Sequence, residues 1–501
     1  MKKQKFLKAF LIFLVFAFFA GIAVIAIIIS RGGLITNEGV VFNSGIIRII
    51  TYPQNLVYDT YLNGEKISHP DNQIKSLVSG TYKLRIEVLG YATWEKDLRV
   101  NTGIVTDVYA KLYPIKLATS QITKTNVDKA FFSSNGEYVY YVVKDSEFGN
   151  EKGIWRLKLN PSEIFLGNNQ SLPSKISNIL AEFADAINNS FYNILISPDN
   201  SKIIFSDISN NKHYLLDVSG GNELLTSIES KLGFNIDSLS WFNSSNSLII
   251  QNGPLLFEYN LTNNLKVLIK YSPEAPAIYS VNNNQIVYFD EKTTKIMVYK
   301  NQTSSPLTVV NITLPEKITS LKLAELVDRF LILGTPNGYK YLDVEKSLIK
   351  DIPNVGKLYN FSGDGRSALF IDDNFSLTAY TVTELVALNT VDVKVNPTGI
   401  ILNPQKYPED KVFFTPQSTH FLYYQQSSST IYVYDKDGSN KTSLLVSSGI
   451  LPYFNFDAQS TSMFVLLEDE IISPTEPVDG TAAGTKSRAN IYKIDLLKPQ
   501  N

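Results

Sequence analysis

The sequence predicts an all-β protein in three parts: an N-terminal transmembrane helix, a small β-sandwich, and a seven- or eight-bladed β-propeller. Three observations predict these parts. An apolar run near the N-terminus predicts the helix, and a following segment in which apolar and polar residues alternate predicts the sandwich. A recurring unit of short strands and polar turns predicts the propeller. The predicted boundaries are residues 1–8 for a cytoplasmic tail, 9–29 for the helix, 30–41 for a linker, 42–115 for the sandwich and 116–501 for the propeller.

The composition narrows the classes of function. With 44% apolar and 19% charged residues, the 501-residue chain is globular in character. The net charge is −2, and the first 31 residues contribute +5, so the remainder carries −7. Nucleic acid is therefore not expected as a partner, because phosphate binding needs a basic face. The absence of cysteine rules out disulfides and thiolate metal sites, and we predict no cofactor, no metal and no catalytic residues.

The run from Ala9 to Ile29 predicts the membrane anchor. About 21 apolar residues are enough to cross a hydrocarbon core of about 30 Å. A cleaved signal peptide is the alternative, but its apolar region is shorter, about 7 to 15 residues, and ends at a small-residue site that is missing here. The positive residues before the run predict a cytoplasmic N-terminus and an extracytoplasmic body, held by one pass through the lipid bilayer. These topology-setting residues are Lys2, Lys3, Lys5 and Lys8.

The segment 42–115 reads as a compact β-sandwich. Residues 45–51 form a β-branched run, and Asn63-Gly64 predicts a tight hairpin because both residues tolerate positive φ. Residues 82–88 alternate apolar and charged side chains, as in a strand with one buried face.

This segment resembles the PEGA domain family. The resemblance lies in the core motif of Gly80, Tyr82, Gly90, Tyr91 and Trp94, followed by the strand at Leu98-Arg99-Val100 and by Leu112-Tyr113-Pro114. It covers about 70 residues, although Leu77-Val78-Ser79-Gly80 stands where the family has Pro-Glu-Gly-Ala. The resemblance implies a small β-sandwich used as a surface or interaction module of extracytoplasmic proteins in bacteria and archaea. Tyr91 and Trp94 are expected to pack in its core, with ligand stacking as the alternative.

From residue 116 onward the repeated unit is a polar turn followed by two strands. The turns include Ser133-Ser134-Asn135-Gly136, Ser197-Pro198-Asp199-Asn200, Asn243-Ser244-Ser245-Asn246 and Asn282-Asn283-Asn284-Gln285, with weaker copies near residues 325, 362, 417 and 458. The mean spacing is about 46 residues, close to the period of a four-stranded propeller blade. Eight blades are counted, or seven if the unit near Glu325 is no blade. The units resemble those of TolB-like and WD-type propellers.

Three segments complete this prediction. Residues 115–123 are a spare strand, which is expected to complete the last blade and close the ring. Residues 174–188 place apolar side chains at helical spacing and predict an inserted amphipathic helix. Residues 473–489, rich in Pro, Gly, Thr and Ala, predict a mobile loop.

No motif in the chain predicts an enzyme. The Gly-x-Ser-x-Gly elbow of serine hydrolases is missing, and His69, His213 and His420 fall in different units. The predicted function is therefore a non-enzymatic, membrane-anchored binding or scaffold protein of the bacterial cell envelope, with a wall polymer or another envelope protein as partner. The alternatives are a propeller hydrolase or lyase acting on an envelope polysaccharide or peptide, with carboxylates at the channel mouth, and a purely structural spacer.

Overall fold

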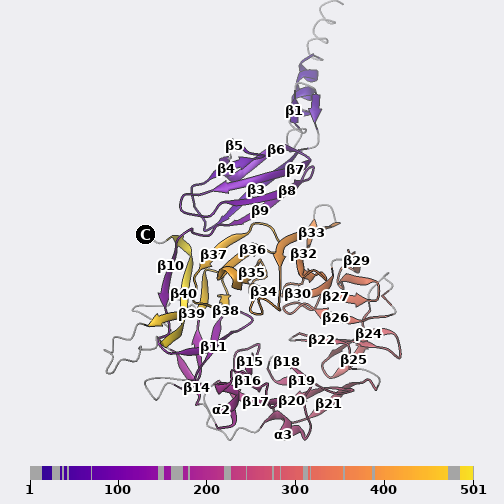
Figure 1. Ribbon diagram of the computed structural model, residues 1–501. Coiled ribbons are helices and arrows are strands. Elements are labelled where there is room, and N and C mark those ends of the chain that lie inside the picture. The colour runs from indigo at the N-terminus through magenta and orange to yellow at the C-terminus, as the bar shows by residue number, and fades with distance from the viewer. Residues whose placement is uncertain are drawn as a thin grey trace, which may run out of the picture. The chain divides into compact units, whose positions relative to one another are not determined.

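The computed structural model describes residues 14–24, 34–36, 39–41, 44–68, 70–144, 152–159, 173–178, 181–218, 227–243, 245–273, 276–282, 284–308, 314–315, 317–353, 356–385, 390–471 and 486–499 (Figure 1). Contacts between residues divide the chain into two compact units, with the main boundary between Lys116 and Leu117.

The predicted location in a membrane is wrong. In the part of the chain that the structure describes, no helix is both long and apolar enough to cross a bilayer. Of the predicted span 9–29, residues 14–24 are described, and they form a short helix. The prediction depended on the length of the apolar run, and the described helix is shorter than that run.

The predicted linker 30–41 contains a short antiparallel hairpin. Its strands are β1 (Leu34–Thr36) and β2 (Gly39–Val41), with Leu34 opposite Val41.

The first unit contains two small sheets, in the orders β6-β3-β9 and β5-β4-β7-β8. The predicted hairpin is confirmed, since Asn63 and Gly64 have φ of 51° and 90° and join β4 to β5. Side chains from both sheets form one buried cluster, which includes Ile47, Leu84 and Trp94. The elements are β3 (Ser44–Tyr52), β4 (Asp59–Leu62), β5 (Glu65–Ile67), η1 (Pro70–Asn72), β6 (Gln73–Val78), β7 (Gly80–Glu87), β8 (Trp94–Val100) and β9 (Val105–Lys111).

The second unit is built from eight consecutive sheets within the described residues, and these are the blades of a ring (Figure 1). The first strands of blades 1 to 8 are β11 (Val127–Phe132), β15 (Tyr192–Ile196), β18 (Ser238–Phe242), β22 (Tyr279–Val281), β26 (Ser320–Leu323), β30 (Lys357–Phe361), β34 (Lys411–Phe414) and β38 (Ile450–Phe456). The second strands are β12 (Tyr138–Val143), β16 (Lys202–Asp207), β19 (Ser247–Asn252), β23 (Ile286–Asp290), β27 (Phe330–Thr335), β31 (Ser367–Ile371), β35 (His420–Gln425) and β39 (Ser462–Ile471).

The third and fourth strands complete each blade outward. The third strands are β13 (Gly153–Lys158), β17 (Lys212–Asp217), β20 (Leu255–Asn260), β24 (Lys295–Lys300), β28 (Gly338–Asp343), β32 (Ser376–Leu385), β36 (Thr430–Asp435) and β40 (Lys486–Pro499). The fourth strands are β14 (Ser174–Ser177), β21 (Lys266–Tyr271), β25 (Thr303–Pro306), β29 (Leu348–Ile352), β33 (Thr390–Ile401) and β37 (Thr442–Val446). Blade 2 has three strands in the described residues, and helix α3 (Ile228–Leu232) lies beside its third strand.

Apolar side chains hold the blades together in a closed circle. Buried clusters join blades 1 to 2, 2 to 3, 3 to 4, 4 to 5, 5 to 6, 6 to 7 and 8 to 1. At the remaining junction Phe413 of blade 7 meets Phe454 of blade 8, with ring centroids 5.2 Å apart. First strands also contact one another between blades 3 and 4, 4 and 5, 6 and 7, and 8 and 1, which places these strands on the inner side of the ring. This arrangement is a β-propeller.

The ends of the ring are joined as the sequence predicts. Strand β10 (Leu117–Gln121) pairs with β40 and becomes the fourth strand of blade 8. Directly after it, the Thr123 hydroxyl accepts a hydrogen bond from the Ile491 amide of β40 at 2.9 Å. The edge that β40 would otherwise expose is therefore paired by a strand from the other end of the ring.

The predicted helix over 174–188 is shorter in the structure. Residues 174–177 pair with β13 as strand β14, and helix α2 (Ala181–Asn188) follows. Its Phe183 and Ile187 are fully buried between blades 1 and 2. Of the predicted loop 473–489, residues 473–485 lie outside the described residues, whereas 486–489 belong to β40. A further short helix in the described residues is η3 (Gln426–Ser428).

Candidate binding site on the ring of turns

The residues predicted to set membrane topology, and those at the ends of the predicted anchor, lie outside the described part of the chain. The former are Lys2, Lys3, Lys5 and Lys8, and the latter are Ala9 and Ile29.

The five PEGA-like residues lie together in the first unit. Gly80 opens β7, and Gly90 forms a turn with φ of 83°. The Tyr82 hydroxyl donates to the Val78 carbonyl at 2.9 Å. Tyr91 and Trp94 are 9% and 2% exposed and belong to the core cluster. The two aromatic rings are thus placed for packing and leave little surface for a ligand.

The eight turns between first and second strands make one continuous surface of the propeller, which we call the turn ring. Its described residues are 133–137, 197–201, 243, 245–246, 282, 284–285, 324–329, 362–366, 415–419 and 457–461. At seven of the eight blade junctions, hydrogen bonds connect a turn to the next one. These bonds are Asn200 Nδ2 to Glu137 Oε2 (3.5 Å), Ser245 Oγ to Asp199 Oδ1 (2.6 Å), Asn282 Nδ2 to Asp328 Oδ1 (2.7 Å), Leu326 N to Gly363 O (2.9 Å), Asp364 N to Ser418 Oγ (3.3 Å), Gln417 Nε2 to Ala458 O (2.8 Å) and Ala458 N to Gly136 O (3.0 Å).

Asp199 illustrates how tightly one of these junctions is fixed. Its carboxylate accepts hydrogen bonds from Ser197, Ser201 and, across the blade junction, Ser245. Burial alone would raise the pKa of Asp199, but the hydrogen bonds from Ser245, Ser201 and Ser197 outweigh it and lower the pKa to about 2. The carboxylate therefore stays ionised and holds two blades together.

The junction between blades 3 and 4 is different. Among the described residues, no hydrogen bond joins the turn of blade 3 to that of blade 4, and a cavity of about 210 Å³ lies between them. We call it the Glu258 hollow; it is lined by Phe242, Asn243, Glu258, Asn284, Asn301 and Gln302.

A buried carboxylate forms the floor of this hollow. Glu258, on the third strand of blade 3, is 3% exposed. One of its oxygens accepts a hydrogen bond from the Tyr299 hydroxyl of blade 4 at 2.6 Å. Neither an ion pair nor a second hydrogen bond reaches the Glu258 carboxylate from the described residues. Burial, reinforced by this hydrogen bond and the Glu258 charge, raises the pKa of Tyr299, so Tyr299 remains a donor.

Amide side chains form the rim. Asn243, Asn284, Asn301 and Gln302 are exposed, and their side-chain amides hydrogen-bond to none of the other described residues. Asn301 and Gln302 form the two-residue turn between β24 and β25, with φ of 51° and 60°. A two-residue hairpin of this type needs positive φ at both positions, which is uncommon for glutamine. The blade therefore maintains a strained turn that places two amides beside the carboxylate.

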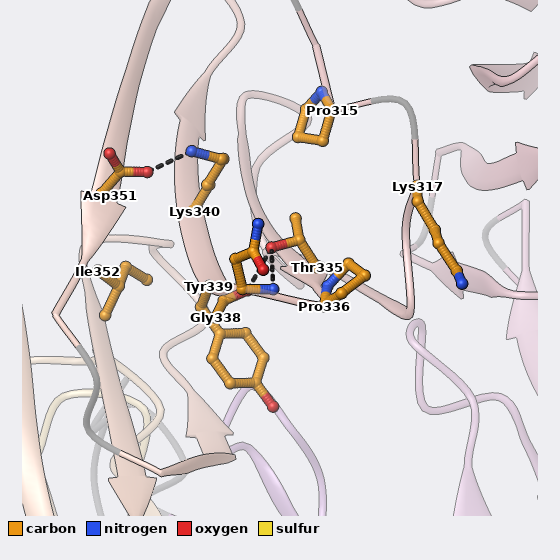
Figure 2. A pocket seen from close by; sticks show the side chains of 10 residues that line it. Pro315, Lys317, Thr335, Pro336, Gly338, Tyr339, Lys340, Asp351 and Ile352 are labelled. Carbon is orange, nitrogen blue, oxygen red and sulfur yellow. Dashed lines mark hydrogen bonds and ion pairs between the residues drawn. The ribbon is translucent and has the colours of Figure 1, made fainter.

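A larger hollow of about 480 Å³ lies at the opposite end of blade 5 (Figure 2). The turn from Thr335 to Gly338 and the end of β29 line it. Its one lining carboxylate already has a partner, since Asp351 pairs with Lys340, and the Thr335 hydroxyl donates to the Gly338 carbonyl at 2.9 Å. Figure 2 shows both interactions on the wall of the hollow. A ligand there would compete with these contacts, whereas the Glu258 carboxylate has an oxygen available.

A further polar cluster lies between blades 1 and 2, around their first strands β11 and β15. Asp128 accepts a hydrogen bond from the Tyr192 hydroxyl and pairs with Lys144, both at 2.6 Å. Lys129 donates to the Ser190 carbonyl at 2.6 Å and lies 4.6 Å from the Tyr192 ring centroid. Burial lowers the pKa of Lys129. Because these groups satisfy one another, the cluster connects blades 1 and 2 without an open position.

The histidines are engaged in local pairs. His213 Nδ1 lies 2.6 Å from Glu229, and His420 contacts Thr419 and Asp435. His69 lies outside the described residues. In the part of the chain that the structure describes, no three His, Cys, Asp or Glu side chains are placed to hold a metal ion.

Comparison with known proteins finds similar solved structures but no family. No family model and no curated protein match the chain. Among solved structures, the β-propeller domain of Cps50 (Swd1) from Myceliophteria thermophila is 12% identical, with 70% of this chain and 96% of that chain covered and a TM-score of 0.33. The WD40 domain of SCAP from fission yeast is 10% identical, with 76% and 95% covered and a TM-score of 0.39. Hsv2 from Kluyveromyces lactis is 10% identical, with 65% and 98% covered and a TM-score of 0.37.

Sequence reasoning did not find Glu258. The residue stands in the apolar run Leu255 to Tyr259, where every neighbour from 256 to 259 is buried. A single acid in a strand buried on both faces is the signal that could have revealed it.

Proposed function

We propose that the protein is a binding scaffold whose propeller holds a partner protein on the turn ring. The observation that carries this proposal is the contrast within that surface: seven junctions are fixed by hydrogen bonds and one holds a hollow with a buried carboxylate. Fixed turns lose little conformational entropy when a partner binds, which favours recognition by a preorganised surface. The carboxylate floor disfavours nucleic acid, because phosphate would be repelled.

The first unit enters the proposal as a PEGA-like module. This part of the proposal is supported by a strand that begins at Gly80, a glycine turn at Gly90, and a buried Trp94 in a two-sheet core. What the resemblance implies is a small surface module that spaces or supports the propeller.

Site-specific photo-crosslinking on the full-length chain in its native cells tests the proposal. A photoreactive phenylalanine analogue is placed on the turn ring at Asn246, Asn284 or Leu326, and on the outer strands at Leu268 or Val446. Leu268 is the matched control for Leu326, because both are leucines and they are 60% and 53% exposed. We expect one protein to be captured from the turn-ring positions and not from the outer strands, and the purified partner to bind the propeller saturably.

Equal capture from both surfaces, or capture from the outer strands alone, would contradict the proposal. A cross-linked polysaccharide in place of a protein would contradict it as well.

A further inference from the structure

We propose that the Glu258 hollow binds the cationic end of a lysine or arginine side chain presented by the partner protein. This inference rests on the proposed function and names the group that the turn ring recognises.

The charge balance at the floor of the hollow is the first argument. A carboxylate removed from water is costly unless it is paired and hydrogen-bonded. Glu258 is 3% exposed and receives one neutral hydrogen bond, from Tyr299 at 2.6 Å. Other carboxylates of similar burial are completed either by more hydrogen bonds or by a cation. Asp207 and Asp457, 2% and 1% exposed, each accept two neutral hydrogen bonds. Asp343, 2% exposed, is held by the Arg329 guanidinium through bonds of 2.7 and 2.6 Å. Among the described residues, Glu258 receives neither a second hydrogen bond nor a cation.

The size and lining of the hollow favour one side-chain terminus. Its volume of about 210 Å³ is below the roughly 300 Å³ at which pockets for whole small ligands begin. The rim amides of Asn284, Asn301 and Gln302 offer carbonyl oxygens that can accept N–H groups left over after a guanidinium or ammonium has met the carboxylate. The side of Phe242 supplies an apolar contact for the methylene stem.

Two other ligand classes fit less well. A calcium ion takes six to eight oxygens, usually including several carboxylates, and the hollow supplies one carboxylate. A neutral sugar could use the rim amides, but its hydroxyls would leave the negative charge of Glu258 without a counterion.

Binding of amino-acid fragments to the full-length protein tests the inference. The probes are Nα-acetyl-arginine methylamide, Nα-acetyl-lysine methylamide and the neutral citrulline analogue, followed by ligand-observed saturation-transfer NMR. We expect the arginine or lysine probe to bind saturably and the citrulline probe to bind at least about tenfold more weakly, since it lacks the charge. Glu258→Gln should weaken binding of the cationic probe by about tenfold or more.

Two further variants keep the test decisive. Asn284→Asp adds a carboxylate at an exposed rim position and should tighten binding of the cationic probe several-fold, whether or not Glu258→Gln folds well. Asp351→Asn replaces a carboxylate by an amide, as Glu258→Gln does, but at the larger hollow, where Asp351 is paired with Lys340, and it should leave binding unchanged. Equal binding of citrulline, displacement of the probe by calcium, tighter binding of N-acetylglucosamine than of either cation, or no response to both Glu258→Gln and Asn284→Asp would overturn the inference.

The outcome separates this inference from the proposed function. If cross-linking from Asn284 and Leu326 still captures the same partner in the Glu258→Gln protein with unchanged affinity, the turn ring is a binding surface and the cation site is wrong. If no position on the turn ring captures a partner, the proposed function itself fails.

Discussion

A carboxylate from a third strand is buried at each of two blade junctions, and the two carboxylates differ in whether a cation pairs with them. Between blades 5 and 6, Asp343 is enclosed by Arg329, which also contacts Glu384 at 2.7 Å. Between blades 3 and 4, Glu258 accepts a hydrogen bond from the Tyr299 hydroxyl alone among the described residues, and it faces a hollow. The first junction is complete within the chain, whereas the second has its negative charge uncompensated.

The difference shows which polar clusters serve stability and which leave capacity for a ligand. At the first junction, Lys346 also pairs with Glu384 at 2.9 Å, and the Arg329 guanidinium lies 4.7 Å from the Phe330 ring centroid. The charged side chains of this cluster pair with one another, so a ligand would gain little binding energy from them. At the Glu258 hollow the blades pack normally although a buried charge has no ionic partner among the described residues. A buried charge of this kind is expected at a binding position.

Loss of the arginine should produce the largest effect. Arg329→Met keeps much of the side-chain volume but leaves Asp343 buried without its partner, so we expect a loss of about 3 to 5 kcal/mol in the free energy of unfolding. The shift of the propeller's urea midpoint measures it. Glu258→Gln is the matched comparison and should cost nothing or stabilise by up to about 1 kcal/mol, because it removes an uncompensated charge. Similar losses in both proteins would show that the junctions do not differ.

The hydroxyl of Tyr299 provides the second comparison. Tyr299→Phe removes the one hydrogen bond to Glu258 and should cost about 2 kcal/mol, as expected for a bond to a charged acceptor. In the Glu258→Gln background the same change should cost roughly half as much, because the acceptor is then neutral. Urea unfolding of the four proteins in this double-mutant cycle gives the coupling energy. A coupling energy of zero would show that the contribution of the Tyr299 hydroxyl does not depend on the charge of Glu258, and would contradict this prediction.

The smallest effect is expected at an ordinary junction of the turn ring. Asp199→Asn weakens the hydrogen bonds from Ser197, Ser201 and Ser245. It should lower the free energy of unfolding by about 1 kcal/mol at neutral pH, a small effect because solvent screens the partly exposed carboxylate. The pKa of Asp199 is about 2 in the folded protein and about 3.9 when unfolded. The stabilisation is therefore complete above about pH 4 and is lost as the pH falls through about 2.

Unfolding measured from pH 2 to pH 7 checks this dependence. A difference between the wild-type and Asp199→Asn proteins that stays constant over the whole range would contradict the role assigned to the carboxylate.

Much of the propeller could be predicted because its signals are local. Turns such as Ser197 to Asn200 and the strands that follow are fixed by residues close together in the chain, and the spacing of the units indicates blades. The spare strand over 115–123 was predictable for a different reason: a last blade with three strands needs a fourth. Blade 5 was in doubt because the turn near Glu325 lacks the usual Ser and Asn residues, but β26 to β29 form a full sheet.

The misses depend on neighbours that are distant in sequence. Residues 174–177 have helical periodicity together with the residues after them, but pairing with β13 makes them a strand. The apolar run 9–29 predicted a longer helix than residues 14–24 form in the described structure. The Glu258 hollow requires Tyr299, Asn284 and Gln302 from the next blade, and nothing in the sequence around Glu258 indicates that these residues meet it.

The pairing of β10 with β40 has a consequence for biosynthesis. The two strands are separated by more than 350 residues, so during translation β10 is made early and its partner emerges only after seven blades have left the ribosome. At about 5 to 20 residues per second, the nascent propeller must wait roughly 20 seconds or more as an unclosed arc. Its two terminal sheet edges stay unpaired throughout that interval. A chaperone that covers these edges would therefore be most useful before β40 is synthesised.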